Sequence, residues 1–396
     1  MTRLRESANA VRRFPPAGAL AALSRSDFPD ELAQVIPITE AFSATYAQAR
    51  DKFVAAAAAL QLPAERHVHP SARGVEGEEL SVDVALLGNP DSRALLVLTS
   101  GMHGVEGFCG SGCQTGLLHD EAILAAVEAS GIGVLFHHAV NPYGFSWLHR
   151  TNEDNVDLNR NFRDFSHPPP HNAAYAGVHA MMVPAEWPPT AENGAAIAAH
   201  VAAHGRAAVQ SAVSGGQSDY PGGLFYAGVA PAWSNVVLRD VLQRHGAKRG
   251  ELGWIDFHTG LGPWGHGEKI YSGPPDPAMI ARAKAWYGAD VTSFYDGSST
   301  SAALTGVSFH AALGACPGAE FTGIALEYGT LPFEATLQAL RADQWLRNHP
   351  GTDAVTRAAI KRQLRDAFHD EREAWKAMVY AQARVAVLQA LRAMRA

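Results

Sequence analysis

The chain has 396 residues, 47% hydrophobic and 18% charged, which is enough apolar material for a core and excludes a wholly disordered chain. A formal net charge of −7 without a polybasic tract argues against nucleic-acid binding. No apolar run reaches the roughly 18 residues of a membrane span, and the 3 cysteines form no disulfide framework. We therefore expect a cytoplasmic protein with no membrane partner.

The N-terminal segment differs from the rest in composition. Residues 1–25 carry five arginines and one acidic residue, as transit peptides do, but no apolar stretch followed by a cleavage site. We interpret residues 1–41 as an N-terminal extension outside the fold. We predict that residues 42–396, C-terminal helices included, form a single catalytic domain.

Hydrophobic patterns predict strands separated by helices. A period of two over 80–86 predicts a strand with one solvated face near a sheet edge. Unbroken apolar runs predict buried strands at 94–99 and 132–140, and two more central strands are predicted at 254–257 and 323–326. Helical patterns fall between and after them, at 42–60, 112–128, 193–210, 231–245, 276–287, 333–346 and 352–396. The alternation indicates an α/β fold whose mixed or mostly parallel sheet is covered on both faces.

Two segments need a separate interpretation. The proline-rich stretch 163–192 lies outside the alternation and is predicted to be a functional or disordered loop. The last segment, 352–396, has apolar residues at helical spacing, which predicts one or two helices that pack on the core.

Reactive side chains follow the predicted central strands, where α/β sheets bind their ligands. His103 and Glu106 follow strand 94–99 as an H-x-x-E pair flanked by glycines, and His258 directly follows strand 254–257. Two histidines and a glutamate are a standard ligand set for catalytic zinc, which keeps a fourth position for water. We therefore predict that these three residues bind Zn²⁺. The competing interpretation is that His103 and Glu106 are ordinary surface-loop residues.

Glu327 ends the apolar strand 323–326, where a charge is costly unless it has a role. A carboxylate beside zinc can take a proton from water and pass it to a leaving group, so Glu327 is the candidate general base. A structural ion pair with a basic residue is the alternative.

The densest polar block of the chain is 149–162. Within it, Arg150 can polarise a scissile carbonyl and stabilise its oxyanion. Arg160 with Asn159 offers a guanidinium fork and an amide donor, which suits a substrate carboxylate.

The acidic residues of this block leave two alternatives open. Glu153, Asp154 and Asp157 can form a salt-bridged turn, in which Arg160 pairs with Asp157 and only shapes the loop. Asp154 and Asp157 can also contribute to a second metal site, which the pattern does not require.

Together these motifs resemble the zinc carboxypeptidase superfamily, and most closely an uncharacterised bacterial branch near the succinylglutamate desuccinylase and aspartoacylase type. The shared features extend from about Phe42 into the C-terminal helices. In chain order they are His103-x-x-Glu106, Asn141-Pro142-x-Gly144, Arg150, Asp157-Leu158-Asn159-Arg160-Asn161, His258 and Glu327. The classical carboxypeptidases carry a mobile tyrosine, which closes over the substrate, shortly before the catalytic glutamate. The chain departs from them here, because no tyrosine lies between Asp296 and Glu327 and the nearest earlier one is Tyr295.

The resemblance implies a three-layer α/β/α sandwich around a mixed, roughly eight-stranded sheet. It also implies a zinc-dependent hydrolase that cleaves an amide or peptide bond next to a free carboxylate, in a small peptide or an N-acyl amino acid. The alternatives are an N-acyl amino acid deacylase of the aspartoacylase or desuccinylase type and an inactive binding protein of the same fold. The resemblance also implies the roles of the site residues. His103, Glu106 and His258 bind zinc, and Glu327 transfers the proton. Arg150 polarises the carbonyl, and Asn159 and Arg160 bind the carboxylate.

Other function classes fit less well. The glycine-rich segment 110–116 lies about ten residues beyond the strand end at which a nucleotide-binding turn would begin. No serine stands in the G-x-S-x-G pattern of serine hydrolases. Cys109 and Cys113 lie near His103 in the sequence, and we interpret them as small buried side chains rather than as thiol nucleophiles.

Overall fold

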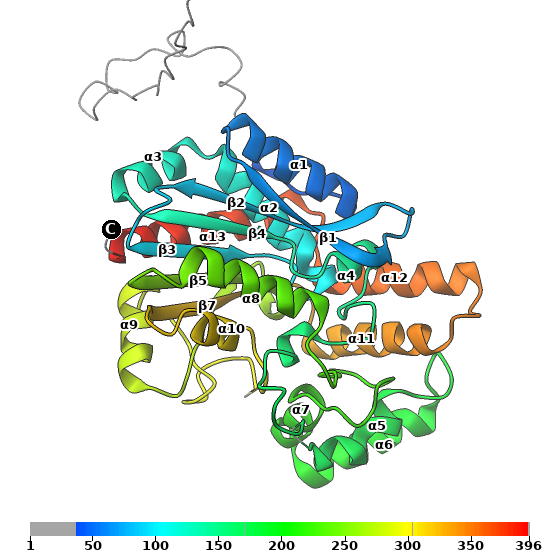
Figure 1. Ribbon diagram of the computed structural model, residues 1–396. Coiled ribbons are helices and arrows are strands. Elements are labelled where there is room, and N and C mark those ends of the chain that lie inside the picture. Colours follow the sequence, from blue (N-terminus) through cyan, green and yellow to red (C-terminus); the bar gives the residue numbers. More distant parts are fainter. Residues whose placement is uncertain (1–36, 170, 303, 395–396) are drawn as a thin grey trace, which may run out of the picture. The chain divides into compact units, whose positions relative to one another are not determined.

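The computed structural model describes residues 37–169, 171–302 and 304–394. Its centre is a mixed sheet with seven strands within these residues, in the order β1-β2-β4-β3-β5-β7-β6 (Figure 1). The four central strands run parallel, and β1, β2 and β6 run antiparallel to their neighbours. The strands are Ala64–Arg73 (β1), Glu79–Gly88 (β2), Ala94–Thr99 (β3), Gly133–His138 (β4), Glu251–Trp264 (β5), Gly267–Ser272 (β6) and Glu320–Gly329 (β7).

The strand count corrects the expectation of about eight. At the edge of the sheet formed by β6, the segment that contains Thr292 forms only an isolated bridge with Ile270 of β6 and no strand. The predicted extension, 1–41, lies almost wholly outside the described residues, which begin at Pro37, so the domain division stays a prediction.

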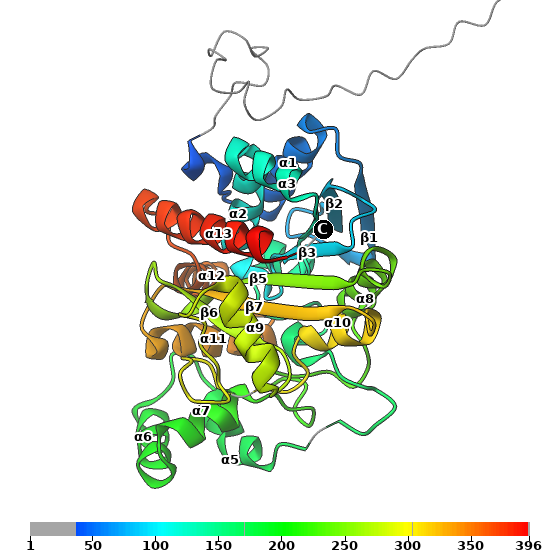
Figure 2. The ribbon, with the colours of Figure 1, turned by 90° about the vertical axis from the view of Figure 1, so that its left-hand side faces the viewer.

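Helices cover both faces of this sheet, which confirms the three-layer sandwich (Figures 1 and 2). One face is covered by α1, α2, α3 and α13, and the other by α8 and α10, whose apolar residues pack on Val97, Leu135 and Trp254. α9 lies against β6 and β7. These helices are Tyr46–Ala59 (α1), Gly107–His119 (α2), Glu121–Ser130 (α3), Trp233–Gly246 (α8), Pro277–Tyr287 (α9), Phe309–Ala315 (α10) and Glu373–Ala393 (α13).

The strand predicted over 80–86 exists as β2, but its predicted solvated face is buried. Ser81 and Asp83 are almost fully buried because α1 covers them. Tyr46 Oη donates to the Ser81 carbonyl at 2.9 Å, and Arg50 Nε lies 2.7 Å from an Asp83 carboxylate oxygen. The alternation therefore marks a polar contact between strand and helix, not a surface exposed to water.

Two predicted helices are each a pair in the structure. The pattern over 112–128 contains both α2 and α3, because Asp120 between them caps α3 by accepting from Ala122 N and Ile123 N. The pattern over 193–210 contains α6 (Ala191–His204) and α7 (Arg206–Ser214), which are separated at Gly205 with φ 84°.

The last segment forms two helices, α12 (Ala354–Phe368) and α13, and most of its apolar stripe is buried as expected. Met378 and Val385 are exceptions, at 40% and 48% exposed. The sequence pattern missed β1, β6 and α10, as well as α4 (Pro142–Trp147) and α5 (Ala173–Met182). α5 lies inside the proline-rich segment, where Asn172 caps its first turn by accepting from Tyr175 N.

A helical group packs beside the sandwich. Figures 1 and 2 both show α5, α6 and α7 side by side, with α11 (Phe333–Asn348) between them and the sheet. Buried apolar residues of α5, α7, α11 and α12 form one cluster that includes Val178, Val213, Leu340 and Leu364. Among the described residues, no helix combines the length and apolar character of a membrane span.

Candidate metal centre

The topology brings the predicted metal ligands to one place. β3 and β5 are parallel neighbours, so the segment after Thr99 lies beside the end of β5, and His258 is paired with Glu327 of β7. Beyond β3 the chain needs a backbone that only glycine allows. Gly101 has φ 65°, and a Cβ at Gly104 would lie 2.0 Å from the Gly144 carbonyl carbon.

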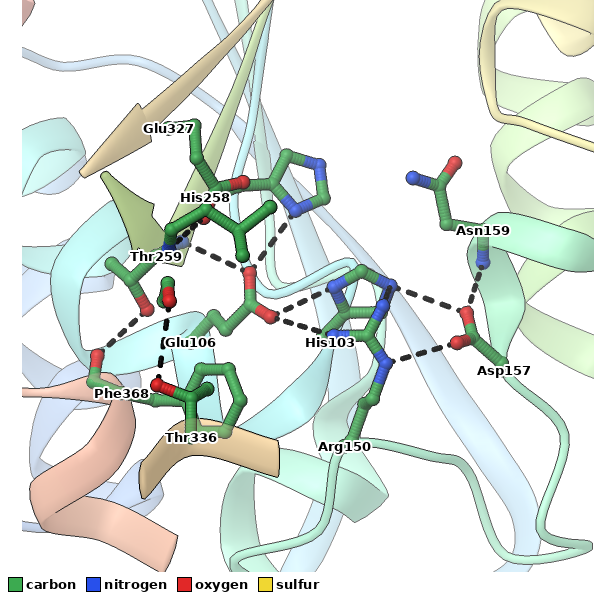
Figure 3. A network of polar contacts seen from close by, with 12 residues as sticks. His103, Glu106, Arg150, Asp157, Asn159, His258, Thr259, Glu327, Thr336 and Phe368 are labelled. Carbon is green, nitrogen blue, oxygen red and sulfur yellow. Dashed lines mark hydrogen bonds and ion pairs between the residues drawn. The ribbon is translucent and has the colours of Figure 1, made fainter. Parts of the chain in front are cut away.

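His103, Glu106 and His258 converge on one point (Figure 3). His103 Nδ1 lies 2.9 Å from Glu106 Oε1, and His258 Nδ1 lies 3.0 Å from Glu106 Oε2. All three side chains are buried, and their candidate ligand atoms lie within 4.8 Å of one another. Two imidazole nitrogens and a carboxylate are the donor set that zinc takes in catalytic sites, so the residues fit this metal.

A carboxylate lies behind each of the two candidate histidine ligands. Asp157 lies 3.2 Å from His103 Nε2, and Asp256 lies 2.9 Å from His258 Nε2. The His258 Nε2–H can therefore donate to Asp256 and leave the Nδ1 lone pair for a metal, whereas His103 Nε2 also lies 2.8 Å from Arg150 Nη2, which can only donate. Asp256 itself accepts from Thr99 Oγ1 at 2.6 Å.

Glu106 is fixed from two sides. The Thr259 backbone N–H donates to its Oε2 at 3.1 Å, and Arg150 Nη1 donates to its Oε1 at 3.1 Å. Burial opposes ionisation, but the contacts with His103 and His258 hold the pKa of the Glu106 carboxyl well below its usual range. Glu106 is therefore an anion at neutral pH, as a ligand must be.

Arg150 is half-buried beside the candidate ligand set. Its Nε donates to Asp157 Oδ2 at 2.9 Å, and its guanidinium lies 5.0 Å from the Phe225 ring centre. The salt bridge within the polar block thus exists between Arg150 and Asp157. It holds the guanidinium next to the candidate metal ligands, so it is compatible with the predicted role.

Glu327 lies across from His258 and is 8% exposed. Its Oε1 accepts from the Leu261 backbone N–H at 3.0 Å, so a backbone amide holds this carboxylate rather than the basic side chain that the sequence left open. Burial, and next the negative charge of Glu106, raise the pKa of Glu327 to about 8. A carboxyl group of this basicity suits proton transfer near neutral pH.

Asn159 and Arg160 lie on the same cavity wall. The Arg160 guanidinium donates to the Ser214 carbonyl from Nε at 2.9 Å and from Nη2 at 2.7 Å, and to the Asn159 carbonyl from Nη1 at 2.8 Å. It does not take part in the predicted alternative pairing with Asp157, which contacts His103 and Arg150. Burial lowers the pKa of Arg160 to about 10, so it remains cationic at neutral pH.

The side-chain oxygen of Asn159 accepts from the Ser308 N–H at 2.9 Å. This contact turns the amide nitrogen toward the metal ligands (Figure 3). A donor and a cation are therefore available on one side of the site, which a bound carboxylate needs.

One cavity of about 580 Å³ contains the whole predicted site. His103, Glu106, His258, Glu327, Arg150, Asn159 and Arg160 all line it. Of the aromatic segment 220–226, Phe225 lines the cavity and Tyr226 packs in the core. Tyr295 does not occupy a closing position in the described structure, because its hydroxyl donates to the Gly273 carbonyl at 2.9 Å.

Comparison with known proteins places the chain in a family. Residues 42–382 match the model of a family described as a protein of unknown function, DUF2817. The chain belongs to the DUF2817 family. No curated protein matches this DUF2817 protein.

Solved structures resemble the DUF2817 protein in fold. Bovine thrombin-activatable fibrinolysis inhibitor, solved with a tick carboxypeptidase inhibitor, matches at TM-score 0.50 and 11% identity over 90% of this chain and 98% of that chain. Carboxypeptidase A from Helicoverpa armigera matches at TM-score 0.45 and 13% identity, over 82% and 74% of the two chains. A Pseudomonas aeruginosa metallo-carboxypeptidase matches at TM-score 0.38 and 14% identity, over 86% of this chain and 68% of that chain. The fold is thus zinc carboxypeptidase-like, as the motifs predicted.

Sequence reasoning missed some of the residues that support the site in this DUF2817 protein. Asp256 stands two residues before His258, so strand alternation places both on one face, and this spacing is the signal that was available. Thr259 acts through its backbone, which no motif reveals. Among the described residues, the group of three that can hold a metal does not include Asp154 or Asp157.

A buried ion cluster behind the site holds the loop that carries Arg150. Asp343 of α11 lies 2.9 Å from His149 Nδ1 and 2.7 Å from Lys361 Nζ of α12. Burial opposes ionisation, but His149 and Lys361 hold the pKa of Asp343 well below its usual range. The His149 and Arg150 carbonyls in turn accept from the backbone N–H groups of Val105 and Gly104, next to the metal ligands.

Asp343→Ala should lower the free energy of unfolding by about 3 kcal/mol, because it leaves Lys361, whose side chain is only 15% exposed, without its counter-charge. Urea unfolding measures this change. The control is Asp240→Ala, which removes an exposed pair with Arg244 on α8 and should cost less than about 1 kcal/mol. Similar small losses in both variants would show that the Asp343 cluster contributes little to stability.

Proposed function

We propose that this DUF2817 protein is a zinc-dependent hydrolase that cleaves an amide or peptide bond next to a free carboxylate. The observation that supports the proposal is the convergence of three candidate metal ligands, a carboxylate of raised pKa and two cationic side chains in one cavity. Zinc, held by His103, Glu106 and His258, would supply a Lewis acid and a binding position for water.

The chain's own residues divide the remaining chemistry. Glu327 takes the proton from the attacking water and delivers it to the leaving amine. Arg150, which lies beside the ligands, stabilises the negative charge that develops on the carbonyl oxygen. Asn159 and Arg160 hold the substrate carboxylate and so orient the scissile bond. An inactive binding protein of the same fold would not need Glu327, and the chain keeps it.

The carboxylate requirement gives the test. A substrate with a free carboxylate should react at least about tenfold faster in kcat/KM than its amide, since a charge-assisted hydrogen bond contributes about 1.5–3 kcal/mol. Arg160→Ala should remove this difference, and Arg160→Lys should restore part of it, because a point charge cannot reproduce the fork. Arg163→Ala, with its side chain stacked on Phe165, is the matched control and should preserve the difference.

The opposite outcome is equally measurable. If Arg160 only shapes its loop, Arg160→Ala should slow the acid and the amide alike and lower the melting temperature. That result would exclude carboxylate recognition by Arg160 and with it the preference for a bond next to a free carboxylate.

A further inference from the structure

The cavity has an apolar part that hydrolysis of the scissile bond does not use. Beyond the candidate ligands, most of its wall consists of aliphatic and aromatic side chains from the helical group and from α11. The polar residues that these helices add to the wall are Arg206, Gln210, Ser214, Glu334 and Thr336. The residues of this apolar wall are Met182, Ile197, Val201, Val209, Val213, Phe333, Leu337 and Leu340. A volume of about 580 Å³ lies within the range of pockets that enclose whole small molecules.

The helix α6 contributes the part of this wall that other side chains cover least. None of its residues is buried, although it carries Ile197 and Val201 one turn apart. Both line the cavity together with Ala198 and Ala202, which lie on the same side of the helix. Ile197 and Val201 pack in part on the buried cluster of α5, α7, α11 and α12, and the apolar surface that they leave open can gain the usual burial free energy by covering an apolar ligand.

The chemistry of the apolar wall limits what can lie there. An extended peptide brings an N–H and a carbonyl with every residue, and these groups lose free energy when they are buried without partners. A second carboxylate, as in a succinyl or aspartyl group, needs a cation. The cation that α7 offers is Arg206, which lines the cavity with an exposed side chain and already forms an ion pair with Glu334 of α11. An aliphatic chain needs neither kind of partner.

Resting on the proposed function, we infer that the substrate is an N-acyl amino acid with a long aliphatic acyl chain. The amino acid carboxylate binds Asn159 and Arg160, the amide lies at the metal ligands, and the acyl chain lies along the apolar wall. Hydrolysis adds the oxygen and one hydrogen of water to the acyl carbon as a fatty acid, and the other hydrogen goes to the nitrogen as a free amino acid.

The test compares acyl groups on one amino acid with the zinc-loaded enzyme. N-acetyl, N-hexanoyl, N-dodecanoyl and N-succinyl derivatives of leucine, phenylalanine, glutamate and lysine form the panel, with N-acetylated dipeptides as peptide probes. Each buried methylene contributes a factor of about four. For the best amino acid, kcat/KM should therefore rise more than tenfold from acetyl to dodecanoyl. A flat series, or a preference for succinyl or for dipeptides, overturns the inference.

A pair of substitutions on α6 tests the position of the acyl chain in the cavity. Ala198→Trp fills the cavity from the side of the apolar wall and should lower kcat/KM for the dodecanoyl substrate at least tenfold, with the acetyl substrate changed less than twofold. Ala203→Trp is the matched control, because Ala203 is exposed on the same helix and does not line the cavity, and it should leave both values unchanged. Equal effects of both substitutions on both substrates would overturn the placement.

Failure of the inference differs from failure of the proposed function. If no substrate of the panel is hydrolysed, the proposed hydrolase is contradicted, and calorimetric binding of N-dodecanoyl leucine then decides the inference separately. Binding at least tenfold tighter than that of N-acetyl leucine, and lost in Ala198→Trp, would support the apolar wall as an acyl site. Equal binding of the two ligands would overturn it.

Discussion

Glu327→Gln should lower kcat by about 10²–10⁴-fold on every substrate, because it removes the proton acceptor and changes little else. The amide keeps an oxygen that can accept from the Leu261 N–H, so the fold and the metal content should be unchanged. Steady-state kinetics, elemental analysis and the melting temperature measure the three quantities. Glu334→Gln is the control, since Glu334 lines the same cavity but lies at the rim in an ion pair with Arg206.

The pH dependence of the rate provides a second readout of the same group. Glu327 acts as a base only when ionised, so activity should rise with pH through its pKa. Burial and Glu106 raise that pKa to about 8, and a bound divalent cation opposes the shift, so the rise should lie below pH 8. Near wild-type kcat in Glu327→Gln, with this rise intact, would show that another group transfers the proton.

His258→Ala should abolish tight zinc binding and, with it, activity. Purified protein should contain about one zinc per chain, and the variant should contain almost none, because three protein ligands define the site. Elemental analysis and titration with a competing chelator measure both. His204→Ala is the control, since His204 is exposed on α6 and lies outside the group of three.

Removal of the Asp256 carboxylate, which lies behind His258, should lower the affinity for zinc but leave the number of zinc ions per chain unchanged. Asp256→Asn keeps the size of the side chain but removes the charged acceptor of the His258 Nε2–H, so zinc affinity should fall about 10–100-fold. Full zinc retention in His258→Ala, or two zinc ions per chain in the unaltered protein, would contradict the single site of three ligands.

Much of the site was predictable because its signals are local. The stretches 94–98 and 323–326 are apolar throughout, so their burial and the polar residues that follow them are visible in a few letters. Parallel neighbouring strands then bring their ends to one edge, which is a general property of α/β sheets. The sequence alone therefore determined the type of fold, the three candidate ligands and the candidate base.

Other features exist only through contacts between distant segments. Asp83 appears solvent-facing in the sequence, but α1 covers it, because Arg50 supplies a charge partner that the pattern of one strand cannot show. The edge strand β6 likewise depends on its pairing with β7. The contacts of Asp157 and Asp256 with the two histidines depend on side-chain direction. The apolar wall could not be predicted either, because Ile197 and Val201 look like core residues in any amphipathic helix. Tertiary structure alone decided that they face a cavity, since only packing determines whether an apolar surface meets another one or remains open for a ligand.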